Sequence, residues 1–237
     1  MTTLKQVMKT LKAKGNDRTR NIYASHALSG DEYFGVPAAD LKLVAKSIKG
    51  DQDLAVELYD TGNRDAMYLA GLVADGRQMS KKQLEAWVKE ANWIWSSEYV
   101  VPWVAAESAH GRALALKWID AKKEHIAAAG WSTYSGIVAT TEDENLDFGE
   151  IKNLLKRIET EIDGAQGRVR YTMNGFVIAV GGLVVPLVKQ AQASAKKIGK
   201  VEVDMGKTAC KVPFASDYIT KMHKSGRAGK KRKVARC

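Results

Sequence analysis

The residues best suited to chemistry lie in an aromatic-rich stretch near the middle of the chain. Within seventeen residues the sequence places Trp87, Trp93, Trp95, Tyr99 and Trp103, and Trp118 and Trp131 follow. Electron-rich aromatic faces stack on nucleobases and attract cations, including an alkylated purine with its formal positive charge. The stretch therefore predicts a platform for a base; the alternative interpretation is that these side chains fill the core between helices.

Helical spacing divides these aromatic residues into two sets. Trp95, Tyr99 and Trp103 share one helix face at positions i, i+4 and i+8, whereas Trp93 lies about half a turn away. One set can then fill the core while the other lines a groove. We predict that Trp93 lines the groove.

Glu98 is the acid that lies among the aromatic residues. A carboxylate beside a sugar can stabilise a developing oxocarbenium ion and align water, so Glu98 is a candidate catalytic residue for breaking a glycosidic bond. The alternative is a surface glutamate that pairs with a nearby lysine. The four histidines show no metal-ligand spacing, and no glycine-rich phosphate loop or dinucleotide fingerprint occurs, so we expect no metal and no cofactor.

Positive charge is concentrated at the C-terminus. Seven of the ten net positive charges lie after residue 223, where no acid occurs, and four are consecutive: Lys230, Lys231, Arg232 and Lys233. Such a run predicts a flexible arm, residues 224–237, that binds the phosphate backbone of a nucleic acid. The alternatives are a solubilising tail, a membrane-surface tether or a nuclear-import signal.

Four arginines of the body recur near the starts of expected helices and are candidates for contacts with the DNA backbone: Arg64, Arg112, Arg168 and Arg170. In a helical-repeat protein, equivalent positions line one concave face, so this recurrence predicts a row of positive charge. Ordinary surface arginines at helix ends are the alternative.

Helical periodicity dominates the elements that must position these residues. Apolar residues at i, i+3, i+4 and i+7 mark helices from Leu4 and from Leu41, and the only strand candidate, residues 200–203, is short. Segments of helix, polar break and aromatic-rich second helix open at Leu54, Leu84, Leu114 and Asn153. We predict an all-α solenoid of HEAT-like, armadillo-type repeats over residues 1–223, with an irregular bundle as the alternative.

Other features concern the cellular setting. The chain has two cysteines and no apparent secretory leader, which predicts a reducing compartment. Because no apolar run reaches about 20 residues, we expect a soluble protein. We further expect it to be monomeric and cytoplasmic, and nucleoid-associated if bacterial.

Several segments resemble the DNA alkylation repair family of HEAT-like-repeat glycosylases, which act on N3- and N7-alkylated purines. The resemblance is carried by Phe34-Gly35-Val36-Pro37 leading to Leu41 through Lys46, by Leu58 through Asn63 before Ala66, Leu69, Ala70 and Asp75, and by Trp87 with Asn92-Trp93. These positions set the fold rather than the chemistry. The resemblance implies a duplex held along a concave basic groove, with the lesion against aromatic surface.

The family's active pattern is Trp-Asp-x-x-Asp, then Trp-x-x-Arg on a later repeat, then a further tryptophan. This chain has Trp93-Ile94-Trp95-Ser96-Ser97, then Trp131-Ser132-Thr133-Tyr134, then Phe176. The resemblance thus implies that Trp93, Trp95, Trp131, Tyr134 and Phe176 bind substrate, while both aspartates and the arginine are replaced.

Two functions follow. The first is a DNA-binding protein of the alkylation-repair type whose partner is duplex DNA, alkylated or distorted; either Glu98 compensates for the missing aspartate and bases are excised, or the chain binds unusual DNA without hydrolysis. The alternative is a non-enzymatic helical scaffold that binds protein or structured nucleic acid.

Overall fold

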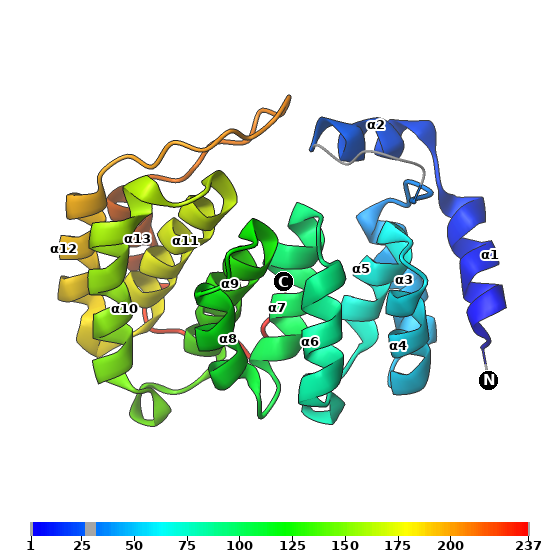
Figure 1. Ribbon diagram of the computed structural model, residues 1–237, viewed down its shortest axis with the longest axis horizontal. Helices are drawn as coiled ribbons and strands as arrows, with labels where there is room; N and C mark the ends of the chain where they lie inside the picture. The colour runs from blue at the N-terminus through cyan, green and yellow to red at the C-terminus, as the bar shows by residue number, and fades with distance from the viewer. Residues whose placement is uncertain (1, 27–31, 237) are drawn as a thin grey trace.

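The computed structural model describes residues 2–26 and 32–236, and across them the fold is all-α, as the sequence predicts. Figure 1 shows the helices side by side in a row from the N-terminus to the last pair. The N-terminal helices are α1 (Leu4–Lys14), α2 (Asp17–Ser25) and α3 (Ala38–Ser47).

Two-helix units build the body, and they confirm the predicted solenoid. The pairs are α4 (Gln52–Asp60) with α5 (Arg64–Val73), α6 (Lys81–Glu90) with α7 (Val101–Ala106), α8 (Gly111–Ile119) with α9 (Glu124–Thr140), and α10 (Phe148–Glu161) with α11 (Gly167–Leu183). A last pair follows, α12 (Val188–Ile198) and α13 (Ala215–Lys224). Short 3-10 turns lie at Gly76–Gln78, Asp143–Asn145, Ile162–Gly164 and Val185–Leu187.

The second helices of successive units form a continuous layer. α11 packs on α9, α9 on α7, and α13 on α11. Helix starts follow from side-chain caps in the polar breaks: Asn63 accepts from the amide of Ala66 at 3.1 Å, and Ser80 and Gln83 form a reciprocal capping box. Side chains of the polar breaks therefore fix where α5 and α6 begin.

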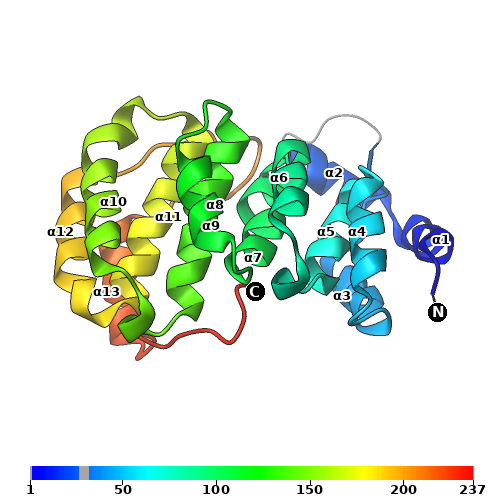
Figure 2. The ribbon, with the colours of Figure 1, turned by 60° about the horizontal axis from the view of Figure 1, so that its bottom comes forward.

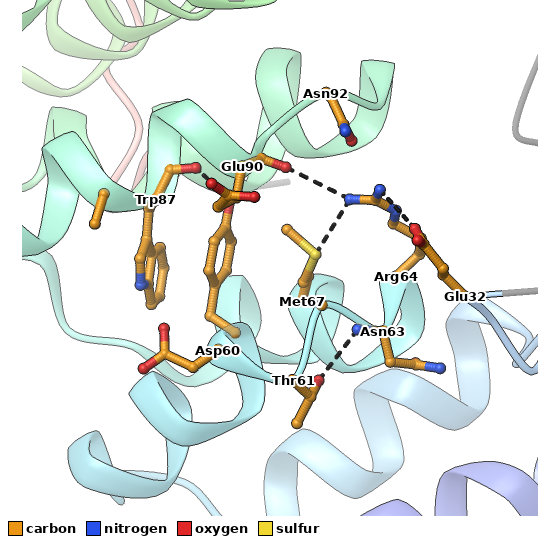
Figure 3. A pocket seen from close by; sticks show the side chains of 12 residues that line it. Glu32, Asp60, Thr61, Asn63, Arg64, Met67, Trp87, Glu90 and Asn92 are labelled. Atoms are coloured by element: carbon orange, nitrogen blue, oxygen red, sulfur yellow. Dashed lines mark hydrogen bonds and ion pairs between the residues drawn. The ribbon is translucent and has the colours of Figure 1, made fainter.

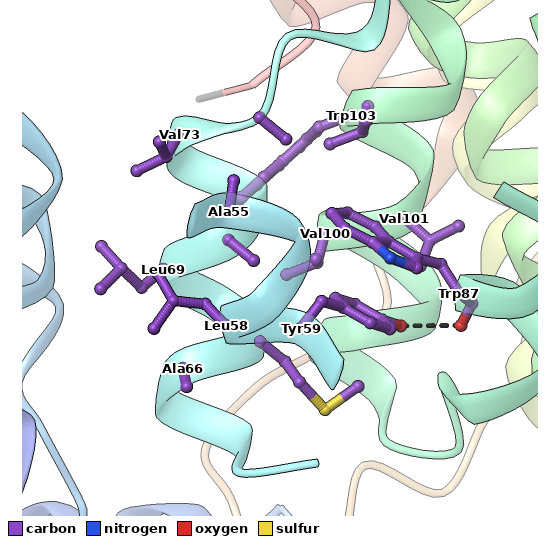
Figure 4. Packing of buried hydrophobic residues seen from close by; sticks show 14 of the residues in the cluster. Ala55, Leu58, Tyr59, Ala66, Leu69, Val73, Trp87, Val100, Val101 and Trp103 are labelled. Carbon is purple, nitrogen blue, oxygen red and sulfur yellow. Dashed lines mark hydrogen bonds between the residues drawn. The ribbon is translucent and has the colours of Figure 1, made fainter. Parts of the chain in front are cut away.

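Two hydrophobic clusters fill the space between the layers, one in each half of the solenoid. In the N-terminal cluster, drawn in Figure 4, the Tyr59 ring stacks on Trp87 with centroids 4.0 Å apart, and its hydroxyl donates to the Trp87 carbonyl at 2.7 Å. The buried Trp87 and Trp118 are therefore core residues, as the alternative interpretation of the aromatic stretch holds.

A π-helical turn, η2 (Ser96–Val100), interrupts the second helix of the α6 unit before α7. The turn carries Glu98 and Tyr99, and π-turns of this kind occur often at functional sites. The turn falls within the i, i+4, i+8 face expected for Trp95, Tyr99 and Trp103, and the rings stay near one another: Tyr99 lies 5.9 Å from Trp103, and Tyr68 contacts both Trp95 and Trp103. Trp95 is half-buried, Tyr99 is exposed at one edge, and Trp103 is buried.

Two helices have no counterpart among those predicted from the sequence. α2 buries only Thr19 and Tyr23, and α12 buries only Ala191, Ser194 and Ala195, so neither buries the large apolar residues by which the other helices are recognised in the sequence. Residues 200–203 form no strand; they begin an extension, residues 199–213, that leaves α12 (orange in Figure 1) and projects toward α2.

The basic C-terminal residues lie against the body, which differs from the flexible arm that the sequence predicts. Residues 225–236, here called the strap, run across the C-terminal ends of α11, α9, α7 and α5 (Figure 2). Gly229 donates to the Gly182 carbonyl at 2.9 Å and Arg232 to the Ala139 carbonyl at 2.7 Å, through their backbone amides. Helix ends present unpaired carbonyls with partial negative charge, and these attract the basic segment.

Within the described residues, no single helix is long and apolar enough to cross a membrane. α11 and the segment from Val185 to Ile198 reach that length and apolarity only together, and they are bent by 113° at the break between them.

Candidate nucleic-acid interface

Aromatic side chains from three elements meet where α2 lies over the start of η2. Tyr23 of α2 contacts Trp93, with ring centroids 5.2 Å apart, and Trp95, at 4.9 Å. Trp93 is 4 % exposed, and its indole nitrogen has no hydrogen-bond partner among the described residues. The prediction that Trp93 lines a groove is therefore wrong, because α2, which the sequence did not reveal, covers it. Trp95 is the more accessible of the two.

Trp95 links this cluster to the second-helix layer. Its ring lies 6.0 Å from that of Tyr68, which in turn lies 5.7 Å from Trp103. His26, at the end of α2, lies 5.8 Å from Trp95. Burial lowers the pKa of His26, and the charge of Arg168 lowers it further. The end of α2 thus lies beside Trp95 and within the influence of the charge of Arg168.

Glu98 is buried and is held by Arg168 of α11, seventy residues away along the chain. The guanidinium donates from Nε and Nη2 to the two carboxylate oxygens, both at 2.6 Å, and the Glu98 side chain is 2 % exposed. Burial raises the pKa of Glu98, whereas the hydrogen bonds and charge of Arg168 oppose that rise. The guanidinium also lies over the Tyr171 ring, 4.4 Å from its centroid.

This pairing changes the chemistry available to both residues. Each carboxylate oxygen of Glu98 accepts a charge-assisted hydrogen bond from Arg168, and the side chain is 2 % exposed, so in this arrangement Glu98 does not reach a sugar or its attacking water. The positive charge of Arg168 is likewise matched by Glu98 rather than presented alone to a phosphate. The structure therefore brings the two predicted residues together as partners, one from the catalytic prediction and one from the DNA-backbone prediction.

The three remaining substrate-binding candidates lie in the core. Trp131 and Phe176 have no exposed surface and Tyr134 is 2 % exposed; Phe176 makes edge-on contacts with both other rings. The Tyr134 hydroxyl donates to Glu150. Because these rings fill the space between α9 and α11, their predicted role in holding a substrate is wrong.

Arg64 and Arg112 are also engaged by acids. Arg64 is 8 % exposed; it donates to Glu32 at 2.9 Å at one side of a hollow of about 680 Å³ (Figure 3). Arg112 pairs with Glu150 at 2.8 Å and with Asp147 at 3.0 Å. Arg170 is half-buried beside the start of the extension. The predicted row of free positive charge on one face is therefore absent among these four residues.

The strap presents only some of its cations to solvent. The Lys231 side chain is 7 % exposed; it forms an ion pair with Asp143 at 2.8 Å and donates to the Val138 carbonyl at 2.9 Å. Its neighbours Lys230, Arg232 and Lys233 are exposed. The predicted basic cluster thus divides into one inward lysine that fastens the strap and three residues with side chains exposed to solvent.

A trough of about 520 Å³ runs over the second-helix layer between the extension and the strap, and sequence reasoning missed it. Its lining includes Glu98, Tyr99, Trp103, Ser132, Ser135, Gly136, Tyr171, Gly175, Lys211, Tyr218 and Arg232. The only signal for the trough in the sequence of α11 is the i, i+4 spacing of Tyr171 and Gly175. One such pair looks the same as a pair that packs in the core, so it does not predict a trough. The trough joins η2, α9, α11 and α13.

The extension closes one side of this region. A Cβ on Gly206 would lie 2.8 Å from the Ser25 carbonyl oxygen at the end of α2, so the tip of the extension touches the N-terminal part of the solenoid. Lys200, Lys207 and Lys211 are exposed along it. The extension therefore adds exposed cations beside the Glu98–Arg168 pair.

Comparison with known proteins places this architecture in a family. Residues 7–197 match the family model described as DNA alkylation repair enzyme. An uncharacterized protein of Listeria innocua is 32% identical over 93% of this chain and 97% of its own length, and one of Listeria monocytogenes is 31% identical over the same shares. A solved structure is 37% identical with a TM-score of 0.89 over 99% of both chains. It is described as a new family of proteins related to the HEAT-like repeat DNA glycosylases, with affinity for branched DNA structures.

Proposed function

The chain belongs to the DNA alkylation repair enzyme family, and from this premise we propose that it binds DNA at branch points without excising bases. The observation that carries the proposal is the buried ion pair between Glu98 and Arg168, in which both oxygens of the predicted catalytic carboxylate are held by the guanidinium away from solvent. The affinity for branched DNA of the solved relative, 37% identical over 99% of both chains, supports the choice of ligand.

The charges of the surface support binding to a polyanion. The chain carries a net charge of +10, and the extension and the strap place exposed lysines on either side of the trough, Lys207 and Lys211 on one and Lys230 and Lys233 on the other. Contacts of these lysines with phosphates release counterions, which favours binding at low salt. Phosphate contacts carry no base sequence information, so the protein selects DNA by shape.

The test of binding compares a four-way junction, a three-way junction and a linear duplex with the same arms by fluorescence anisotropy over a range of salt. We expect the junctions to bind at least about tenfold more tightly than the duplex, a difference of about 1.4 kcal/mol. The logarithm of affinity should fall steeply with the logarithm of salt concentration. Equal affinity for branched and linear DNA, or no binding at all, would contradict the proposal and favour a protein-binding scaffold.

A second experiment tests the absence of base excision. Under single-turnover conditions, duplex DNA that contains 7-methylguanine or 3-methyladenine should lose no base beyond the rate without protein. Base release that disappears in Glu98→Gln would instead restore Glu98 as a catalytic residue, with the ion pair opening when substrate binds.

A further inference from the structure

The trough has the size and lining of a site for a small organic ligand rather than for a duplex. Its volume of about 520 Å³ lies within the range of about 300–1,000 Å³ that is usual for such sites. α9 and α11 supply its floor, where small residues keep the helix backbones close to the surface: Ser132, Ser135, Gly136 and Gly175. A Cβ on Gly175 would meet nothing within 4 Å, so the floor is open at that point.

Aromatic rings from three other positions stand around this floor. Tyr218 of α13 is 46 % exposed and Tyr99 of η2 is 36 % exposed, and Tyr171 of α11 is half-buried under the Arg168 guanidinium. The Tyr99 ring packs on Trp103, with centroids 5.9 Å apart, which holds the ring in place. Rings that are partly exposed and rigidly held are suited to stacking on flat ligands.

The charges around the trough suit a ligand with an anionic backbone. Among the described residues that line it, Glu98 is the only acid, and Arg168 neutralises it. Lys211 of the extension and Arg232 of the strap lie on opposite sides, because the extension meets α11 near Asn174 and the strap meets it at Gly182. Partly exposed aromatic rings with cations beside them are the arrangement by which proteins hold single-stranded nucleic acid.

We infer that the trough binds unpaired nucleotides at the branch point of a DNA junction, with their bases stacked on the exposed rings of Tyr99 and Tyr218. Bases inside a duplex are already stacked on one another, so only unpaired nucleotides present their faces to these rings. The inference rests on the proposed function for its choice of DNA, but it assigns a different part of the ligand to a different surface: phosphates of the arms to the exposed lysines, and unpaired bases to the trough.

The decisive variant is Gly175→Leu, which places a branched apolar side chain on the floor of the trough. Its side chain enters open space on a helix, where replacement of glycine favours the helical conformation, so the thermal midpoint should not fall. The matched control is Gly164→Leu, because Gly164 also has nothing within 4 Å of an added Cβ but lies outside the trough. The probes are a labelled oligothymidylate of 20 nucleotides, a junction with unpaired thymidines at its centre, a fully paired junction and a linear duplex.

We expect Gly175→Leu to weaken binding of the oligothymidylate and of the junction with unpaired thymidines by about tenfold or more, and binding of the duplex by less than twofold. Gly164→Leu should bind all four like the wild type. Should Gly175→Leu fail to fold, Tyr218→Ser, at an exposed position, should give the same pattern of loss. If both variants fold and bind every probe like the wild type, the trough is not the site.

The two proposals fail in different ways. If wild-type protein binds the junctions no better than linear duplex, the proposed function fails. If it prefers the fully paired junction to the junction with unpaired thymidines and does not bind the oligothymidylate, the proposed function stands and the trough inference is overturned.

Discussion

Glu98 and Arg168 form one ion pair, although the sequence predicts a separate role for each. Each was chosen for chemistry with DNA, one as a catalytic acid and one as a phosphate contact, yet their side chains are 2 % and 18 % exposed and each is the partner of the other. A buried carboxylate costs free energy unless a cation compensates it, so the arginine is needed wherever the glutamate is buried. The pair joins η2 to α11 and so fixes one end of the trough.

At this scale we predict the effect of Glu98→Gln on stability. The change leaves the charge of Arg168 without its counterion in a largely buried position, so the free energy of unfolding should fall by about 3 kcal/mol. The double variant Glu98→Gln/Arg168→Met removes the orphaned charge and should be more stable than Glu98→Gln alone. Urea denaturation measures both; a loss below about 1 kcal/mol in the single variant would mean that solvent already screens the pair.

Among the elements, the loop before α3 depends on one buried carboxylate. Asp65, with no exposed surface, accepts from the backbone amides of Phe34, Gly35 and Val36 at 2.6, 3.0 and 2.9 Å, and from the Tyr23 hydroxyl at 3.2 Å. Burial, and then the charge of Asp65, raises the pKa of Tyr23. The Phe34–Pro37 motif is therefore a binding loop for this carboxylate, and it places α2 over Trp93.

The element-scale prediction concerns Asp65→Asn. Asparagine offers one acceptor oxygen, and its amide group would face backbone donors, so at least two charge-assisted hydrogen bonds are lost and the free energy of unfolding should fall by about 3 kcal/mol. Near-ultraviolet circular dichroism should also change, because Trp93 and Trp95 lose the cover of α2. Asp60→Asn, at an exposed position on α4, is the control and should leave both signals unchanged.

The elements also show where sequence reasoning succeeds and where it stops. Repeats with large apolar residues at helical spacing, such as those at Leu54, Leu84 and Leu114, are visible in the sequence because each of these residues is buried against the next unit. α2 and α12 bury mainly small or polar side chains and leave no such pattern. The partners of Glu98 and Arg168 lie seventy residues apart, and no local spacing encodes a contact of that range.

For the whole molecule, the strap connects repeats that are not neighbours. Between Gly229 and Arg236 it contacts the ends of α11, α9 and α5 in the reverse of chain order, and the Arg236 guanidinium donates to the Leu72 carbonyl. In a solenoid each repeat otherwise contacts only its neighbours, so unfolding can begin at either end. A strap across several repeats couples their stability and holds its outward cations in fixed positions beside the trough.

The last prediction separates the two roles of the strap with neighbouring lysines. Lys231→Met leaves Asp143 and the Val138 carbonyl without their buried cation, so it should lower the free energy of unfolding by about 2 kcal/mol and shift the end repeats most in hydrogen exchange. Lys230→Met, at an exposed position, should leave stability unchanged but reduce the slope of log affinity for junction DNA against log salt by about 0.9, the loss of one phosphate contact. If Lys231→Met has the thermal midpoint of the wild type while Lys230→Met lowers it, Lys230 rather than Lys231 holds the strap against the body. If both variants have the stability of the wild type, the strap is the free arm that the sequence predicts.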